Sequence, residues 1–288
     1  MPAGGKPTVR SRRLGTALRR HREAAGLDQA DGAEAIMKSA TKISRLESGQ
    51  TSASALEVRT LLDRYGVADH DERTRLDEWA RRSNERGWWI DFPETVSPDY
   101  ADHITLESDA TYIRTWQPVR IPGLLQTPDY AEAVIAIGPT VIAPERVAKR
   151  VEVRRERQRR IVEGGAHFTA IIWEPALTAL PRQVRTAQLA HLLEAGQRQN
   201  ITVQILPGAE SVTAGMSGPF SAFSFGVEAT VEAVTLENLA NTTVVEAPTD
   251  LTLYVNVFDQ LRSVALSPDK SAERLRQTLE DAPQCMGA

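Results

Sequence analysis

Cysteine is almost absent from this sequence of 288 residues, and so are long apolar runs. The one cysteine, Cys285, lies three residues from the C-terminus, which excludes an internal disulfide and fits a reducing compartment. The longest apolar runs are far shorter than the ~20 residues of a membrane-spanning helix. The basic N-terminal stretch has no apolar segment behind it, so we expect no secretory signal. Together these features predict a cytoplasmic protein without membrane contact.

Patterns typical of enzyme sites are also missing from the sequence. The histidines have no metal-ligand spacing, and neither a cysteine–histidine pair nor a nucleophile elbow occurs. Glu174, beside Trp173 at the end of a predicted strand, resembles a helix N-terminal acid more than a catalytic carboxylate. We therefore expect no catalytic residue, no metal and no cofactor.

The charge is distributed unevenly along a sequence of globular composition. Hydrophobic residues make up 41% and charged residues 25%, as in folded domains. Residues 1–64 hold 12 Lys and Arg against 7 Asp and Glu, whereas the remainder holds 22 against 31. Because residues 1–64 are basic and the remainder is acidic, only the N-terminal segment is expected to bind a polyanion.

The first part of the sequence predicts an all-helical domain over residues 11–84, after a flexible basic arm at 1–10. Helical periodicity and end signals outline five short helices, the last over about 71–84 with Leu76 and Trp79 buried. On the first helix the predicted inner face consists of Leu14, Ala17, Leu18 and Ala25. The predicted N-caps are Asp28, Ser39 and Ser54, and the predicted helix ends are Gly26, Gly49 and Gly66.

Residues 85–98 predict a linker, and residues 99–282 a second domain of mixed α and β structure. Its predicted helices cover 99–113, 128–137, 144–163, 182–198, 249–265 and 268–281. About four strands are expected from runs rich in β-branched and aromatic residues, at 168–173, 201–206, 220–225 and 231–236.

Residues 27–54 carry a more specific pattern. Gln29 follows the cap Asp28, Ser39 caps the next helix, and that helix ends in Ile-Ser-Arg-Leu-Glu-Ser-Gly at 43–49. This stretch resembles the helix-turn-helix of Cro/C1-type (XRE) transcriptional regulators. The resemblance implies sequence-specific binding of double-stranded DNA, with the helix after Ser39 in the major groove, and a homodimer.

Ile43 and Leu46 belong to the packing face of this helix, which leaves its other side chains for DNA. Base contacts are expected from side chains near its start, and phosphate contacts from Gln29 and the loop that follows the helix. The predicted DNA-binding residues are Gln29, Ser39, Ala40, Thr41, Lys42, Ser44, Arg45, Gln50 and Thr51. Glu47 is expected to be structural, paired with an arginine of the first helix such as Arg19 or Arg20.

Two positions depart from the pattern of the XRE family. Gly32 stands where that family usually has a buried apolar residue, and Met37 where it usually has the glycine of the turn. Because side chains with a Cβ disfavour the left-handed conformation, Met37 predicts a turn without a left-handed residue.

The second domain carries another resemblance. Glu107, the Pro-Gly-Leu-Leu-Gln-Thr run from 122, the arginine-rich helix at 145–160 and the Gly-Met-Ser-Gly-Pro-Phe stretch at 215–220 are similar to the C-terminal domain of actinobacterial WhiJ-like, antitoxin-like regulators. The resemblance implies a regulator whose second domain binds a small partner protein encoded nearby.

The arginine-rich helix leaves several readings open. It is a solvated charged face, a second DNA contact, or a docking surface for an acidic partner, with Arg150, Arg154 and Arg157 as the candidate partner contacts. Beside the DNA-binding regulator, two alternatives remain: an antitoxin-like protein that sequesters a small partner, and a ligand-gated repressor with a pocket in the second domain.

Overall fold

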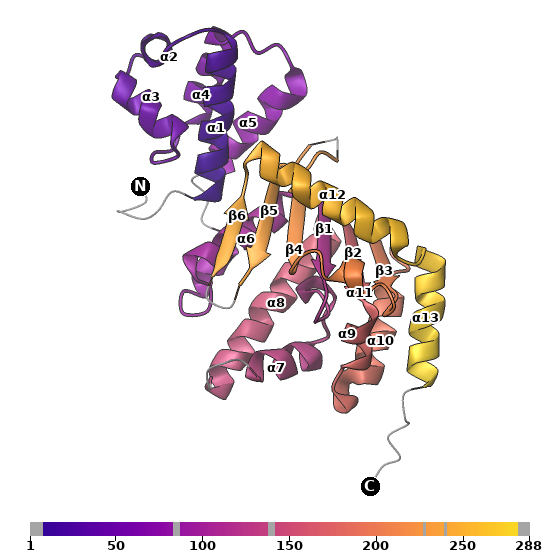
Figure 1. The fold of residues 1–288 in the computed structure, drawn as a ribbon. Coiled ribbons are helices and arrows are strands. Elements are labelled where there is room, and N and C mark those ends of the chain that lie inside the picture. Colours follow the sequence, from indigo (N-terminus) through magenta and orange to yellow (C-terminus); the bar gives the residue numbers. More distant parts are fainter. Residues whose placement is uncertain (1–7, 83–86, 138–141, 227–228, 239–240, 282–288) are drawn as a thin grey trace. The chain divides into compact units, whose positions relative to one another are not determined.

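The computed structural model describes residues 8–82, 87–137, 142–226, 229–238 and 241–281. The chain divides into two compact units, residues 1–90 and 91–288 (Figure 1). The predicted basic arm falls mostly on residues 1–7, and Cys285 also lies outside the described residues. No described helix is both long and apolar enough to cross a bilayer.

The first unit is built from short helices. They are α1 (Val9–Ala24), α2 (Gln29–Ala35), α3 (Ala40–Glu47), α4 (Ala55–Arg64) and α5 (His70–Arg82), followed by a 3-10 turn η1 (Trp88–Asp91) that spans the unit boundary. The three predicted N-caps are confirmed, because the side chains of Asp28, Ser39 and Ser54 each accept a backbone N–H of the following turn. The predicted helix ends are confirmed as well, since Gly26, Gly49 and Gly66 all have positive φ.

The core of the first unit lies where α1, α3, α4 and α5 converge. Leu18, Ile43, Leu61 and Leu76 are almost fully buried there. The predicted inner face of α1 holds for Leu14, Ala17 and Leu18 but was wrong for Ala25, which is exposed because it caps the helix beyond its last turn. Burial of these leucines supplies most of the driving force, since helices this short are marginal alone.

The second unit combines a sheet with helices on both sides. Its helical elements are α6 (Pro98–Asp109), η2 (Gly123–Leu125), α7 (Pro128–Ala136), α8 (Pro144–Gly164), α9 (Glu174–Thr178), α10 (Arg182–Ala195), α11 (Ser211–Ala214), α12 (Pro248–Val264) and α13 (Pro268–Glu280). Its strands are β1 (Tyr112–Gln117), β2 (His167–Trp173), β3 (Ile201–Leu206), β4 (Phe220–Ser224), β5 (Ala233–Glu237) and β6 (Thr242–Val245).

In the described residues these strands form one six-stranded mixed sheet in the order β3-β2-β1-β4-β5-β6. Strands β1, β2 and β3 are parallel and linked by helical crossovers, whereas β4, β5 and β6 are antiparallel. The prediction of about four strands was therefore wrong. The predicted helix over 99–113 ends at Asp109, and the aromatic and β-branched run that follows pairs as β1. Strand β6 has four residues, too few for a sequence pattern to mark.

The two faces of the sheet differ in chemistry. One face is apolar, and Trp116, Phe220 and Val234 pack there against Phe258 and Leu261. Both of these residues belong to α12, the long helix that runs across the sheet in Figure 1. Because side chains alternate along a strand, the residues between them point to the opposite face. There Thr115 and Ser221 line a cavity together with residues of α6 and α8. One face of the sheet therefore packs into an apolar core, and the other face borders a cavity with a polar lining.

Candidate nucleic-acid interface and candidate ligand pocket

Helix α3 has one buried and one exposed face, as a recognition helix requires. Ile43 and Leu46 are 1% and 3% exposed, and they anchor the helix in the core. The exposed residues are Ser39, Ala40, Thr41, Ser44 and Arg45. Within the described residues, no hydrogen bond or ion pair engages the guanidinium of Arg45. Its charge and its donors are therefore available to phosphate or to a guanine edge.

A buried ion pair fixes α3 to α1. Arg22 donates two hydrogen bonds to Glu47, from Nε to Oε1 at 2.6 Å and from Nη2 to Oε2 at 2.9 Å. Gln29, at the start of α2, donates from Nε2 to the same carboxylate at 3.0 Å. The pairing of Glu47 with Arg19 or Arg20 was wrong: those arginines lie on the exposed side of α1, whereas Arg22 follows Leu18 by one turn on its buried side. Gln29 thus braces α3 through the carboxylate of Glu47.

The loop after α3 is tied back to the helix by a lysine. The ammonium of Lys42 donates to Thr51 Oγ1 at 3.4 Å and to the carbonyl of Ser52 at 3.2 Å. Gln50 is exposed and Thr51 is half-buried beside it. Lys42 thus holds this loop at the edge of the exposed face, with its ammonium partly satisfied inside the protein.

The turn between α2 and α3 is a Schellman motif with a methionine at the left-handed position. Met37 has a φ of 52°, its N–H donates to the carbonyl of Glu34, and the N–H of Lys38 donates to the carbonyl of Ala33. The prediction of a turn without a left-handed residue was therefore wrong. The backbone takes a left-handed conformation here although the residue carries a Cβ, which makes this position strained.

Met37→Gly should stabilise the first unit by about 0.5–1 kcal/mol, since glycine adopts this conformation without steric cost. The Met37 side chain is 89% exposed, so its removal sacrifices little packing. Differential scanning calorimetry of the full chain measures the gain as a higher Tm. Met37→Ala removes the same side chain and keeps the Cβ; an equal gain in that variant would show that backbone strain is not the cause.

Gly32 is explained by a close approach rather than by a missing apolar contact. A Cβ at this position would lie 2.6 Å from the hydroxyl oxygen of Tyr65, which is buried in the same core. Gly15 on α1 has the same role against α3, since a Cβ there would lie 2.2 Å from the carbonyl oxygen of Leu46. The sequence analysis did not single out Gly15, although a glycine within a helix is a signal of close packing.

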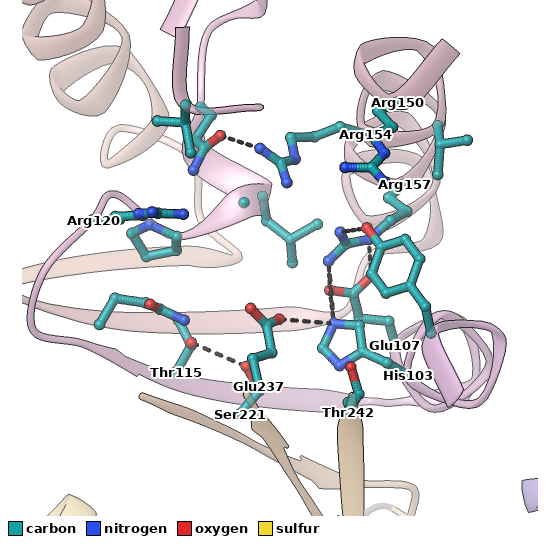
Figure 2. Close-up of a pocket in the computed structure, with 18 of the residues that line it drawn as sticks. His103, Glu107, Thr115, Arg120, Arg150, Arg154, Arg157, Ser221, Glu237 and Thr242 are labelled. Atoms are coloured by element: carbon teal, nitrogen blue, oxygen red, sulfur yellow. Dashed lines mark hydrogen bonds and ion pairs between the residues drawn. The ribbon is translucent and has the colours of Figure 1, made fainter. Parts of the chain in front are cut away.

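The second unit contains a cavity of about 470 Å³ between the polar face of the sheet and the helices α6 and α8. Its size falls within the range of small-molecule sites in proteins. Figure 2 shows Arg150, Arg154 and Arg157 of α8 on one side, Arg120 across from them, and Thr115 and Ser221 from the sheet. Glu107 and Glu237 also line it. The cavity therefore gathers side chains from segments that are far apart in the sequence.

Two of the charged residues form a buried pair. Arg157 donates from Nε to Glu107 Oε2 at 2.7 Å and from Nη2 to Oε1 at 2.6 Å. Tyr100 and His103 of α6 contact the same guanidinium. Burial opposes ionisation of Glu107, but the charge of Arg157 outweighs it and lowers the pKa of the carboxyl to about 2. Burial likewise opposes the charge of Arg157, and Glu107 nevertheless raises the pKa of Arg157.

Arg154, one turn before Arg157, has no such partner. Its Nη1 donates to the side-chain oxygen of Gln126, while its buried Nε has no hydrogen-bond partner among the described residues. Burial and the nearby charge of Arg157 both lower the pKa of Arg154. Arg154 is half-buried, and a partly desolvated cation without a carboxylate is energetically costly, so this residue marks a place where the protein by itself leaves a charge uncompensated.

A network of glutamines holds the wall of the cavity formed by residues 121–126. Gln158 donates to the carbonyls of Gly123 and Gln126, at 2.9 and 2.8 Å. The fully buried Gln188 donates to the carbonyl of Leu125 at 2.7 Å and accepts the N–H of Thr127 at 2.8 Å. These side chains satisfy the backbone of a segment that has no strand or long helix of its own. The wall is thereby rigid before any ligand arrives.

The interpretation of α8 as a solvated charged face holds for most of its cations, which are exposed, but not for Arg154 and Arg157. Of the three candidate partner-binding arginines, Arg157 is buried in its pair with Glu107, Arg154 extends into the cavity, and only Arg150 is exposed. Arg120 was missed, because a lone arginine in a loop gives no signal in sequence. Glu174 begins α9, as the reading of a helix N-terminal acid predicted, and it is paired with Arg274.

The fold and the exposed side of α3 define the first unit as a helix-turn-helix domain, the architecture of DNA-binding regulators. Comparison with family models agrees, since residues 13–76 match the family described as helix-turn-helix domain. Residues 100–277 match the family described as domain of unknown function (DUF5753). This match covers more than half of the chain, which therefore belongs to the DUF5753 family. Comparisons with curated proteins and with solved structures give no significant match.

Proposed function

We propose that this DNA-binding regulator reads an operator with α3 in the major groove, as a homodimer. The observation that carries the proposal is the exposed row on α3, with Thr41, Ser44 and Arg45 free of the core and Glu47 fixing the helix from behind. Two recognition helices of a dimer lie about 34 Å apart, so the operator should have half-sites one helical turn apart.

The remaining predicted residues have supporting roles in this proposal. Gln29 braces α3 and reaches phosphate at the start of α2, while Lys42 positions Gln50 and Thr51 against the sugar-phosphate backbone. Ser39 caps α3 and presents its first turn. Catalysis has no part in the proposed function.

Arg45→Ala should weaken operator binding at least about tenfold, because a charged contact to a base or phosphate is lost. A chromosomal fragment selected by the wild-type protein serves as the probe, and fluorescence anisotropy measures the dissociation constant over a range of salt concentrations. If Arg45 contacts phosphate, the salt dependence of binding becomes shallower by about one counterion per site.

The matched control is Arg81→Ala, which removes the same charge from α5, a helix that packs on α1 and α4. Wild-type affinity is expected there. Lys42→Ala should also weaken binding, through the loop that it holds. If Arg45→Ala and Lys42→Ala both bind the fragment as tightly as the wild type, α3 is not the recognition helix.

For the second unit we propose the role of a signal-receiving domain. The cavity and the inward orientation of Arg154 support binding of a small molecule. The relationship to WhiJ-like, antitoxin-like regulators and the small partner protein that it implies remain predictions. Purification of the full chain from its host separates the two ideas: a retained metabolite supports the signal-receiving domain, and a stoichiometric small protein supports the antitoxin-like function.

A further inference from the structure

The charges that line the cavity do not balance. Four arginines face two glutamates there. Glu107 is fully engaged by Arg157, and Glu237, with its side chain 49% exposed, lies 3.9 Å from His103 Nε2. In the described parts of the chain, no ion pair joins a carboxylate to Arg120, Arg150 or Arg154. The cavity thus has an excess of positive charge that the rest of the unit does not neutralise.

Arg154 shows where the negative charge of a ligand would sit. Its Nη1 is held by Gln126, and Gln126 is itself fixed by donating to the carbonyl of Ile121 at 2.6 Å. This arrangement orients the guanidinium at the wall of the cavity that it lines. The Nε is enclosed without a hydrogen-bond partner, and Gly123 packs beside it, since a Cβ there would lie 3.6 Å from that nitrogen. A ligand oxygen therefore has to approach the guanidinium from the cavity side.

The rest of the lining suits an organic molecule with polar groups. Thr115 and Ser221 supply hydroxyl groups on the floor of the cavity, 3.0 Å from each other. Asn238 and Asn241 add amides at the β5–β6 end. Leu124 and Val134 form an apolar wall. A free inorganic ion would satisfy the arginines and leave this surface empty, whereas a small organic acid or phosphate ester fills both parts.

We propose that the cavity binds a small organic anion, whose carboxylate or phosphate group is held by Arg154 with Arg120 and Arg150. An oxyanion matches the planar donors of a guanidinium and compensates the half-buried charge of Arg154, which has no carboxylate partner among the described residues. This inference deepens the signal-receiving role proposed above and rests on it only for the effect on DNA. Binding of the anion is a property of the second unit and is measured without an operator.

The experiment uses isothermal titration calorimetry and thermal unfolding of the full chain with three probes: orthophosphate, glycerol 3-phosphate and citrate. Sodium chloride at equal ionic strength is the reference. We expect saturable binding of at least one probe, with a rise in the Tm of the second unit. Preference for glycerol 3-phosphate identifies a phosphate ligand, and preference for citrate a carboxylate ligand.

Arg154→Gln should weaken that binding about tenfold or more, because the oriented cation is lost. Without probe, its Tm should equal or exceed that of the wild type, since an uncompensated, half-buried charge is removed. Arg155→Gln is the matched control: Arg155 is the next residue of α8, exposed and outside the cavity, and the variant has the same net charge. Its affinity should stay within about twofold of the wild type.

Three results would overturn the proposal. The first is the absence of saturable binding by all three probes in the wild type. The second is an equal loss of affinity in Arg154→Gln and Arg155→Gln, which would mark a general charge effect. The third is unchanged binding in Arg154→Gln. None of them affects the proposed reading of an operator by α3, which is measured separately by the anisotropy assay.

Discussion

Glu107→Gln should lower the free energy of unfolding of the second unit by about 3–5 kcal/mol, the cost of breaking a buried ion pair on one side. The amide can accept only one of the two hydrogen bonds that Arg157 donates to the carboxylate, at 2.7 and 2.6 Å. Arg157, which is only 6% exposed, also loses its counter-charge. Calorimetric unfolding of the full chain, followed through the transition of this unit, measures the loss.

The same pair makes the second unit sensitive to acid. The pKa of Glu107 is about 2 in the folded chain against an ordinary value of 4.5, so its ionised form stabilises the fold. That contribution, on the order of 3 kcal/mol, is complete above about pH 5 and is lost as the pH falls toward 2. In Glu107→Gln this part of the acid dependence should disappear.

The control is Glu152→Gln, an identical change at an exposed position of α8. Its unfolding free energy should stay within about 0.5 kcal/mol of the wild type. If Glu107→Gln and Glu152→Gln unfold alike at neutral pH, the pair between α6 and α8 contributes no net stability.

Glu47→Gln should destabilise the first unit by about 3–5 kcal/mol and weaken operator binding with it. Glu47 is the meeting point of three helices: it lies at the end of α3, accepts two hydrogen bonds from Arg22 of α1, and accepts a third from Gln29 of α2. Neutralising it leaves the buried Arg22 without the counter-charge of this carboxylate, with the amide oxygen and the carbonyl of Leu27 as acceptors. The recognition helix then loses the support that fixes its position.

Glu34→Gln, on the exposed side of α2, is the matched control and should behave as wild type in both assays. The two readouts for Glu47→Gln are the Tm of the first unit and the affinity for the selected fragment at a temperature where the variant is folded. A variant with normal Tm and normal affinity would contradict the structural role assigned to Glu47.

The helix-turn-helix was predictable because its signals are local. Asp28, Ser39 and Ser54 cap helices through contacts within three residues, and a sequence pattern records such contacts directly. Ile43 and Leu46 repeat at helical spacing, so the buried side of α3 followed from periodicity alone. The errors in this unit concern pairing across helices: the partner of Glu47 depends on the rotation of α1 against α3, which no local pattern encodes.

The second unit was harder to predict, because more of its structure depends on contacts between segments that are distant in the sequence. The residues of β1 and β6 favour strands, but both segments are short, and their pairing partners lie on other strands of the sheet, for β1 on β2 and on β4 more than a hundred residues away. Arg155 and Arg157 have similar neighbours in the sequence of α8, but Arg155 is exposed and Arg157 is buried. The difference comes from Glu107, the ion-pair partner of Arg157, which lies 50 residues earlier in the chain.

The linear order of residues therefore determined the short capped helices, the basic front and the exposed side of α3, because each depends on side chains a few positions apart. Tertiary structure alone decided the six-stranded sheet, the burial of Arg157 and the position of Arg154 in a cavity. These depend on which distant segments share a low-dielectric interior, where the energy of a charge is set by its neighbours in space.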